Sequence, residues 1–590
     1  MVKQTRTELM LGNSAVARGL YEAGVRVVSS YPGTPSTEIT ECAAVFGEEP
    51  VRDGDTGLYA EWAPNEKVAA EVAFGASLGG ARGFCAMKHV GLNVAADPVY
   101  TSSYTGVNAG FVIAVADDPG MHSSQNEQDS RHHAIAAKIP MLEPSDSEEC
   151  RVFTKLAFEL SEEYDTPVLL RLTTRVSHSQ SVVTLSEREH IPLRDYVKDV
   201  QKNVMMPAMA RKRHVLVEER TKKLTEYSEN SPLNKIERGG DIGIIAAGST
   251  YNYAKEALGG RASYLKLGMV NPLPVKLIKS FAATVKTLIV CEELDDIIET
   301  HCKKHGVKVR GKELFSLCGE YSQSAIKKAV LGEENEYITF PEPLPARPPA
   351  LCAGCPHRGV FLALKGLKVY ISGDIGCYTL ASQKPLAQTD LCLCMGASVS
   401  SLHGFNLARG EVQAKKSVAV IGDSTFIHSG ITGLINIAYN KGISTVILLD
   451  NSITGMTGHQ NNPANGLTLK GEKTVSVDII SLAKAVGFGS VSVVDPYDVE
   501  TTKSVIAREL QNDFPSLIVA SRPCAILKTV KRGAPLVVNQ NCTSCRACLS
   551  VGCPAISLTD GKAYIDGVQC NGCGICMYAC KFGAIEGGRA

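Results

Sequence analysis

The sequence has no net charge and no long apolar run. Its 590 residues include 61 Lys plus Arg and 61 Asp plus Glu, so no net field favours nucleic acid or an anionic membrane. No run of 18 apolar residues is present, which argues against a membrane-spanning helix. Residues 1–20 carry Gln, Thr, Glu and Asn where a signal peptide needs an apolar core. These absences predict a cytoplasmic protein.

The sequence is rich in cysteine for such a protein. Its 20 cysteines are poor candidates for disulfides in a reducing compartment, and clustered cysteines there indicate metal or redox chemistry. The apolar content of 44% is enough for large cores. At about 150 residues per domain, the length predicts three or four domains.

Two strand ends between residues 418 and 460 form a candidate metal site. VAVI before Gly422 predicts a buried parallel strand, ITGLINIAYNKG the helix behind it and STVILL the next strand. Asp423 and Asn451 therefore fall at neighbouring strand ends. Mg²⁺ prefers oxygen ligands, which these two side chains and the Ile453 carbonyl supply. The alternative is an ordinary strand–turn–helix with a capping Asp.

The first 190 residues predict a doubly wound α/β domain with polar groups at its strand ends. RVVSS from Arg26 is a predicted strand and YPGTPST is the turn after it. Glu66 starts a long Ala/Gly-rich helix, where it is either functional or a surface residue matched to the helix dipole. His89 follows a strand, and the loop containing His122, Ser123, Asn126, Glu127 and Arg131 is a possible pocket lining.

A second group of cysteines lies between residues 346 and 535. Cys352 and Cys355 form a CxxC pair, and Cys377 and Cys524 follow at predicted strand ends. Four such thiolates suit either a [4Fe–4S] cluster or Zn²⁺. The alternative is a reduced CxxC turn with two buried cysteines. Cys392 and Cys394 alternate along an apolar strand, which predicts core packing for both.

The last 55 residues carry the strongest pattern in the chain. Two CxxCxxC runs are each followed by a fourth cysteine, which is typical of a two-cluster bacterial ferredoxin. The fourth cysteine of each run binds the other cluster in that framework. The first cluster then takes Cys542, Cys545, Cys548 and Cys580, and the second takes Cys570, Cys573, Cys576 and Cys553. The metal–thiolate bonds would hold together a segment too short for a large core.

Several segments resemble known enzymes. A Gly-Asp pair followed by an Asn is similar to the signature of thiamine-diphosphate (TPP) enzymes, with Ser424 where the signature has Gly. NEKVAAEVAFGAS resembles their pyrimidine-binding domains. Five further segments resemble elements of 2-oxoacid:ferredoxin oxidoreductases: YPGTPS, CAGCPHR, DIGCY, GMTGHQ and SRPC. His357 and Arg358, in the second of these segments, depart from the family's pattern. We therefore expect an α/β fold: several doubly wound, transketolase-like TPP domains and a small C-terminal two-cluster ferredoxin-like α+β module.

The resemblance implies roles for individual residues. Glu66 would lie beside the TPP pyrimidine, and Asp423, Asn451 and Ile453 would bind Mg²⁺. The residues implied to bind TPP are Gly376, Tyr378, Gly422, Ser424, Gly455 and Met456. Thr34 is implied to hold the substrate carboxylate, with His89 and Arg131 as further substrate-binding candidates. Cys352, Cys355, Cys377 and Cys524 would hold a third [4Fe–4S] cluster.

The order of the segments resembles the alpha subunits of indolepyruvate:ferredoxin oxidoreductases. The expected parts are a pyrimidine domain (1–194), a linker with a helix (195–240), a transketolase C-terminal-like domain (241–340), a diphosphate/Mg²⁺ domain (346–535) and the ferredoxin-like module (536–590). The implied reaction is oxidative decarboxylation of an aryl 2-oxoacid to acyl-CoA and CO₂, with electrons passing to ferredoxin. The implied assembly pairs the chain with a smaller beta subunit as α2β2, with the thiamine site between subunits.

Two kinds of alternative function, three functions in all, stay open at this point. One is another specificity within the same oxidoreductase family, because apolar content alone does not choose a substrate. The other is a different class of protein: a non-oxidative TPP decarboxylase, or an electron-transfer subunit that has lost thiamine chemistry. The decarboxylase would have no use for the ferredoxin-like cysteines, and the electron-transfer subunit would not need the Mg²⁺ ligands.

Overall fold

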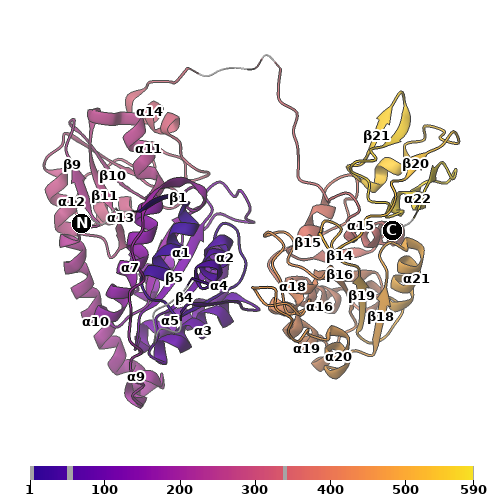
Figure 1. Ribbon diagram of the computed structural model, residues 1–590, viewed down its shortest axis with the longest axis horizontal. Helices are drawn as coiled ribbons and strands as arrows, with labels where there is room; N and C mark the ends of the chain where they lie inside the picture. The colour runs from indigo at the N-terminus through magenta and orange to yellow at the C-terminus, as the bar shows by residue number, and fades with distance from the viewer. Residues whose placement is uncertain (1–5, 50–56, 337–339, 341, 589–590) are drawn as a thin grey trace. The chain divides into compact units, whose positions relative to one another are not determined.

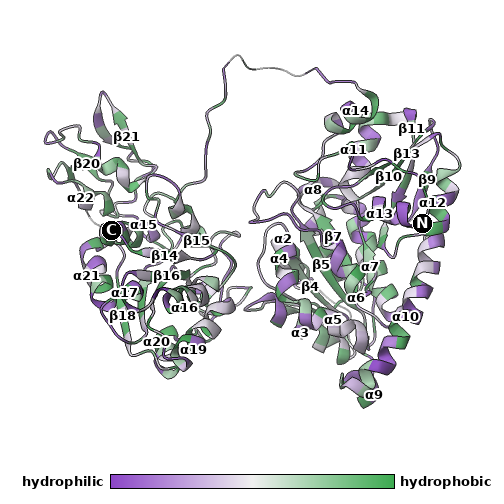
Figure 2. Ribbon diagram, turned by 180° about the vertical axis from the view of Figure 1, so that it is seen from behind, coloured by the Kyte–Doolittle hydropathy of each residue, from purple (hydrophilic) through white to green (hydrophobic). Residues whose placement is uncertain are grey.

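A computed structural model of the chain describes residues 6–49, 57–336, 340 and 342–588. The chain forms two compact units, Met1–Thr339 and Phe340–Ala590 (Figure 1). Hydrophobic residues concentrate on the central strands of each unit, such as β5 and β16 in Figure 2. No helix within the described residues combines the length and apolar composition that a membrane span requires.

A seven-stranded sheet forms the centre of the first unit. Its neighbouring strands are parallel apart from the β12–β6 pair. In spatial order they are β12 (Met269–Asn271), β6 (Met141–Leu142), β7 (Val168–Thr173), β5 (Phe111–Asp117), β4 (Gly83–Lys88), β2 (Val27–Ser30) and β3 (Tyr59–Trp62). Every residue of β4, β5 and β7 is buried, as expected for strands covered by helices on both faces. The associated helices are α1 (Gly12–Glu22), α2 (Thr37–Phe46), α3 (Glu66–Leu78), α4 (His89–Val94), α5 (Ala96–Thr105), α6 (Arg131–Ala137), α7 (Ser147–Tyr164) and α8 (Thr174–His178).

A second sheet of four strands belongs to the same unit. Its order is β13 (Thr287–Cys291), β10 (Ile242–Ala247), β11 (Ala262–Leu267) and β9 (Lys235–Glu237), with β9 antiparallel. The predicted linker helix is present as the 24-residue α10 (Pro207–Asn230). The remaining elements are β1 (Thr7–Leu11), which pairs with β8 (Gln180–Thr184), and α9 (Val200–Asn203), α11 (Gly248–Leu258), η1 (Gly259–Arg261), α12 (Val275–Ala282), α13 (Ile297–Lys304) and α14 (Gln323–Leu331).

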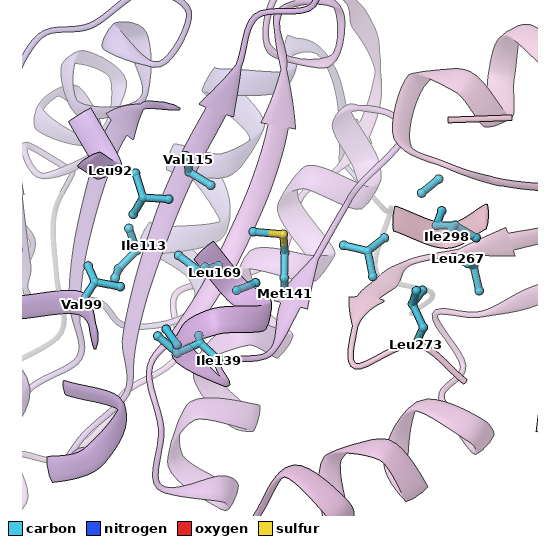
Figure 3. Close-up of a cluster of buried hydrophobic side chains, with 14 of the residues drawn as sticks. Leu92, Val99, Ile113, Val115, Ile139, Met141, Leu169, Leu267, Leu273 and Ile298 are labelled. Carbon is cyan, nitrogen blue, oxygen red and sulfur yellow. The ribbon is translucent and has the colours of Figure 1, made fainter. Parts of the chain in front are cut away.

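The two sheets of this unit share one apolar core. Leu92, Ile113 and Leu169 lie on the side of the first sheet, and Leu267 and Ile298 come from the second sheet and its helix (Figure 3). Strand β12 also pairs with β6 and so extends the first sheet. Residues of both expected domains, 1–194 and 241–340, therefore contribute to this core.

A buried ion cluster also joins the two sheets, and it contains Arg131. The Arg131 guanidinium pairs with Asp129 (2.6 Å) and with Glu292 (2.6 Å), which follows β13. It also donates to the carbonyls of Glu293 (3.1 Å) and Asp295 (3.0 Å). These partners occupy the side chain, which is only 1% exposed. The expectation that Arg131 binds substrate is corrected: it is a structural ion-pair residue.

The second unit is built on a six-stranded parallel sheet. Its order is β15 (Leu391–Cys392), β14 (Tyr370–Gly373), β16 (Ser417–Gly422), β17 (Thr445–Asp450), β19 (Ser516–Ser521) and β18 (Ser490–Val494). The helical segments are α15 (His357–Leu367), η2 (Cys377–Ser382), α16 (Ala397–Arg409), α17 (Glu411–Ala414), α18 (Asp423–Thr425), η3 (Phe426–Gly430), α19 (Ile431–Tyr439), α20 (Ile479–Ala485) and α21 (Val499–Glu509).

The cysteine-rich C-terminal segment packs within this second unit. Two short antiparallel pairs and two helical turns make up its regular structure: β20 (Val537–Val538) with β23 (Ile585–Glu586), β21 (Ile556–Thr559) with β22 (Lys562–Ile565), η4 (Ala547–Val551) and α22 (Ile575–Ala579). Its apolar residues, including Val551 and Ile575, join a core cluster with Phe361 and Val420 of the sheet domain. The segment is thus docked onto the parallel-sheet domain.

Breaking the ion cluster of the first unit should destabilise the chain. Arg131→Ala leaves the buried Glu292 without its partner, and loss of one member of a buried pair costs about 3–5 kcal/mol. The matched control is Arg310→Ala, which breaks an exposed pair with Glu313 and should cost less than about 1 kcal/mol. Urea denaturation of the full chain measures both. Equal effects of the two changes would contradict a structural role for Arg131.

Candidate functional site

The carboxyl ends of β16 and β17 bring two predicted metal ligands together. The strands are paired in parallel register, with Gly422 opposite Leu449. Asp423 directly follows β16 as the first residue of α18, and Asn451 directly follows β17. Both side chains are buried, with Asp423 only 2% exposed. The pairing of the strands therefore sets the distance between these two groups.

Three oxygen-bearing groups converge at this point. The Asn451 amide oxygen lies 3.1 Å from Asp423 Oδ1 and 2.9 Å from the Ile453 carbonyl oxygen. Adjacent ligands in an octahedral Mg²⁺ site with bonds of 2.0–2.1 Å are about 2.9 Å apart. With its amide turned over, Asn451 would instead donate its NH₂ to both oxygens at the same distances. The spacing fits Mg²⁺ binding by Asp423, Asn451 and Ile453.

Asn462, which the sequence did not single out, supports Asp423. Its Nδ2 donates to Asp423 Oδ2 (3.4 Å) and to Thr454 Oγ1 (3.3 Å). Thr454 Oγ1 in turn donates to Ser424 Oγ (2.9 Å). Ser424, the departure from the usual glycine, lies in a helical turn and ties Asp423 to the loop after β17. The sequence shows only a polar run, HQNNPAN, around Asn462.

The Asp423 carboxyl is poorly solvated. Burial raises its pKa to about 7, with a smaller contribution from the charge of Asp450 included in that value. A carboxylate held in such a place gains more from a cation than an exposed one does, because little water competes for it. The electrostatics of the site therefore favour a bound divalent cation.

Tyr378 packs against two glycines near the same edge of the sheet. An added Cβ at Gly422 would lie 2.8 Å from Tyr378 Cε1, and one at Gly376 would lie 2.5 Å from it. Both glycines are therefore needed to make room for the ring. The Tyr378 hydroxyl donates to the Ile375 carbonyl (2.9 Å) and the side chain is buried. Met456, by contrast, is half exposed in the loop after β17.

The first unit gathers its candidate residues at the ends of four adjacent strands. Glu66 starts α3, the helix after β3, and Asn65 caps that helix by accepting from Val68 N (2.9 Å). Glu66 is only 5% exposed, and an added Cβ at Gly91 would lie 2.7 Å from its Oε1. Glycine at position 91 thus leaves room for the Glu66 carboxylate.

Thr34 and His89 lie at the same edge. Thr34 is in the turn after β2, and its carbonyl accepts from Ser123 Oγ (3.4 Å) in the loop after β5. His89 starts α4 after β4, is fully buried, and places Nε2 3.0 Å from Asn126 Oδ1. His89 Nδ1 is buried with no hydrogen-bond partner among the described residues. The edge formed by β3, β2, β4 and β5 therefore collects Glu66, Thr34 and His89 but not Arg131.

Four cysteines of the second unit lie near one another, as their mutual effects on pKa show. The pKa of the Cys355 thiol is raised to about 12, mainly by burial and in smaller part by Cys377 and Cys352. Burial raises that of Cys377 to about 11, with further contributions from Cys524 and Cys352. Cys377 Sγ also lies beside Gly455, where an added Cβ would be 3.5 Å away. The cysteine quartet thus adjoins the loop that carries Ile453.

The eight C-terminal cysteines sort into two groups. Cys542, Cys545, Cys548 and Cys580 line one pocket, and Cys553, Cys570, Cys573 and Cys576 line another. The pKa values agree: Cys548 is raised first by burial and then by the other members of its group, and so is Cys576, to about 12. Each group is made of the four cysteines that the spacing assigned to one cluster.

Within the part of the chain that the structure describes, no group of three or more His, Cys, Asp or Glu side chains could hold a single metal ion. A [4Fe–4S] cluster makes a different demand, because each thiolate binds its own iron and the four sulfurs surround the cluster. The Mg²⁺ ligand set is also of another kind, with one carboxylate, one amide and one carbonyl. The donor sets at these sites suit the groups that the sequence implies.

Arg358 connects the CxxC loop to the C-terminal segment. Its guanidinium donates to the carbonyls of Val551 (2.8 Å) and Gly552 (2.7 Å), and to those of Leu351 (2.8 Å) and Cys352 (3.0 Å). The side chain is almost fully buried. Arg358, which departs from the family's Gly-rich element, therefore holds the CxxC loop against the C-terminal cysteine-rich segment.

Cys392 and Cys394 correct a prediction. Both are exposed, although alternation along an apolar strand had predicted core packing. The reason is topological: β15 is a two-residue strand at the edge of the sheet, and Cys394 lies beyond its end. An edge strand pairs on one side only, so alternation there does not imply burial.

Comparison with known proteins agrees with this arrangement. Residues 18–237 match the family "Pyruvate flavodoxin/ferredoxin oxidoreductase, thiamine diP-bdg", and residues 374–520 match "Thiamine pyrophosphate enzyme, C-terminal TPP binding domain". The chain is 40% identical to the indolepyruvate oxidoreductase subunit IorA of Archaeoglobus fulgidus, over 98% of this chain and 97% of that protein. The IorA subunits of Methanothermobacter thermautotrophicus (38%; 98% and 97% covered) and Thermococcus kodakarensis (40%; 98% and 96% covered) are similarly close. The chain belongs to the family of the IorA subunits of indolepyruvate oxidoreductases.

Proposed function

We propose that the chain catalyses the TPP-dependent oxidative decarboxylation of aryl 2-oxoacids of the indolepyruvate type. The products are an aryl-acyl-CoA and CO₂, and the electrons pass through iron–sulfur clusters to ferredoxin. The observation that carries the proposal is the adjacency of two sites: Cys377 of the cysteine quartet lies beside Gly455, in the loop that carries the Ile453 carbonyl. A site for a phosphorylated cofactor next to a redox site is what such an oxidation needs.

The diphosphate end of the cofactor would be held by the second unit. Asp423, Asn451 and Ile453 bind Mg²⁺, while Asn462 orients the Asp423 carboxylate. Ser424, Gly455 and Met456, in the turn after β16 and the loop after β17, would contact the cofactor. Gly376, Tyr378 and Gly422, which pack against one another, would contact it as well. When bound, TPP supplies a nucleophilic carbon for the carbonyl group of a 2-oxoacid.

The first unit would supply the acid–base and substrate groups. Glu66 holds a proton at its carboxylate beside N1′ of the pyrimidine, and its burial keeps water from competing for that proton. Thr34 and His89 lie at the same edge of the sheet and are placed to contact the substrate. Thr34 would hold the carboxylate with its hydroxyl.

Three [4Fe–4S] clusters would be bound by the three groups of cysteines. The CxxC loop adjoins the second C-terminal group: Ala353, Gly354 and Arg358 help to line the pocket of Cys553, Cys570, Cys573 and Cys576. Electrons would therefore pass from the quartet to this group, then to that of Cys542, Cys545, Cys548 and Cys580. The proposal gives the last segment a two-cluster ferredoxin-like fold.

The partners follow from the same reading. The relatives are named as subunits, so the chain would work with a smaller beta subunit, as α2β2, in the cytoplasm. CoA is the second substrate and ferredoxin the electron acceptor. The non-oxidative decarboxylase is the weaker alternative, because twelve grouped cysteines would then have no task.

Loss of the Mg²⁺ ligand should abolish activity. The assay is reduction of a viologen dye by the anaerobically purified chain and its beta subunit with indolepyruvate and CoA. Loss of a residue that only supports a metal ligand typically lowers activity about 10- to 100-fold. We expect Asn462→Ala to lower the rate within this range. Asp423→Ala removes a ligand itself and should lower the rate more than about 100-fold. The control is Asp513→Ala, which removes an exposed carboxylate paired with Lys415 and should stay active. Dye reduction that persists in Asp423→Ala would rule out the thiamine reaction.

Binding of Mg²⁺ and TPP should weaken below neutral pH. The pKa of Asp423 is raised from its ordinary value of 3.8 to about 7 in the folded chain. Protonation of Asp423 therefore stabilises the metal-free folded chain, and this contribution to the free energy of unfolding is lost as the pH rises through 7. The metal must displace that proton at lower pH. Calorimetric titration should therefore show affinity about tenfold weaker at pH 6 than at pH 8. Affinity independent of pH would contradict this assignment.

Iron content tests the third cluster. The full chain should hold about twelve iron atoms, four for each of three clusters. Changing both Cys377 and Cys524 to Ser should reduce this to about eight, because two of four ligands are lost. The matched control changes Cys392 and Cys394 to Ser, which lie outside the three groups and should leave the count unchanged. An unchanged count in the first variant would remove the quartet from the ligands.

A further inference from the structure

Lys88, the last residue of β4, is a buried cation without an ion-pair partner. Its side chain is 8% exposed, and its Nζ donates to the Ser123 carbonyl (2.6 Å), with Ser123 Oγ at 3.4 Å. Within residues 6–49, 57–336, 340 and 342–588, no carboxylate forms a salt bridge with it. A buried ammonium group normally has a carboxylate partner, because removing its charge from water costs several kcal/mol.

The nearby acid does not fill this place. Burial lowers the pKa of Lys88 to about 8, and the charge of Asp118 only partly opposes that effect. The Asp118 oxygens are already engaged: Oδ2 accepts from Ser123 N (2.9 Å) and Ser124 Oγ (2.6 Å), and Oδ1 accepts from Thr174 Oγ1 (2.6 Å). A cation retained without its own counter-charge is a feature of functional sites.

The other basic side chains near this edge are already paired. Arg131 belongs to the buried ion cluster with Asp129 and Glu292. Arg175 and His122 both pair with Glu320. Among the described residues around the ends of β2, β4 and β5, Lys88 is therefore a basic side chain that is available to bind an anion from outside the chain.

The position of Lys88 is next to the predicted substrate turn. An added Cβ at Gly33 would lie 3.2 Å from Lys88 Cβ, so the lysine packs against the turn that carries Thr34. Ser123, which accepts from Lys88 through its carbonyl, donates through its hydroxyl to the Thr34 carbonyl. Strand β2 lies between β4 and β3, so Lys88, Thr34 and Glu66 follow adjacent strands of one sheet.

We infer that Lys88 binds the carboxylate of the 2-oxoacid substrate, together with the Thr34 hydroxyl. This inference rests on the proposed function and adds to it a residue that determines selection of acids over neutral carbonyl compounds. The ion pair forms with the substrate before CO₂ leaves. Its loss should therefore raise KM more than it lowers kcat.

A variant pair tests the inference in the full chain with its beta subunit. Lys88→Met keeps the length of the side chain and removes its charge, and Lys88→Arg keeps the charge. Lys286→Met is the matched control, an exposed lysine far along the chain at the start of β13. KM and kcat are measured with the aryl 2-oxoacid and with the aldehyde that lacks its carboxylate. We expect Lys88→Met to raise the KM for the oxoacid about 10- to 100-fold. The KM for the aldehyde should stay within about twofold of the wild-type value.

Three outcomes would overturn the inference: an oxoacid KM within about twofold of wild type, an equal loss for oxoacid and aldehyde, or a loss in Lys88→Arg as large as in Lys88→Met. The second outcome would mean that Lys88 only ties the Ser123 loop to the turn. If wild type reduces no dye, the proposed function fails instead. Calorimetric binding of the corresponding 2-hydroxy acid and its amide to wild type and Lys88→Met then decides the role of Lys88.

If Lys88→Met does not fold, the wild-type chain gives the answer. The titratable groups on the elements around Lys88 are Tyr31 after β2, Asp118 after β5, His89 in α4 and Glu66 in α3. Lys88 loses its charge above pH 8, so binding of the 2-hydroxy acid should weaken between pH 7 and pH 9 while binding of the amide stays constant. Parallel behaviour of the two compounds, or no change in either, would overturn the inference.

Discussion

The parallel pairing of β16 with β17 is the constraint on which the candidate cofactor site depends. It sets Asp423 against Asn451, whose amide oxygen lies 3.1 Å from Asp423 Oδ1 and 2.9 Å from the Ile453 carbonyl oxygen. These groups are buried, and burial, with a smaller contribution from the charge of Asp450, raises the pKa of Asp423 to about 7. Asn462, Thr454 and Ser424 then keep the Asp423 carboxylate in position.

The first unit uses the same principle with different residues. Parallel strands β3, β2, β4 and β5 end at one edge, so residues from four separate segments of the chain meet there. Glu66, Thr34, His89 and Lys88 are all brought to this edge by strand order rather than by proximity in sequence. The shared core with the second sheet and the buried ion cluster around Arg131 make the edge part of a rigid body.

The cysteine-rich C-terminal segment has little regular structure. The C-terminal segment contains only short strands and turns, and its cysteines line its two pockets. Its apolar residues, such as Val551 and Ile575, pack against the parallel-sheet domain. Arg358 provides a further contact, since its guanidinium bridges carbonyls of the CxxC loop and of the segment that follows Cys548.

The sequence by itself determined the α/β class of the two large regions and the grouping of the cysteines. It also placed Asp423, Asn451 and Glu66 at strand or helix ends, because strand periodicity and short cysteine spacings are local properties. Tertiary structure alone decided the rest. Arg131 and Glu292 are 161 residues apart, so no local pattern could reveal that their pairing removes Arg131 from the substrate candidates. The exposure of Cys392 depends on the order of strands in a sheet. The lack of a salt-bridge partner for Lys88 among the described residues depends on which carboxylates other segments of the chain bring near it.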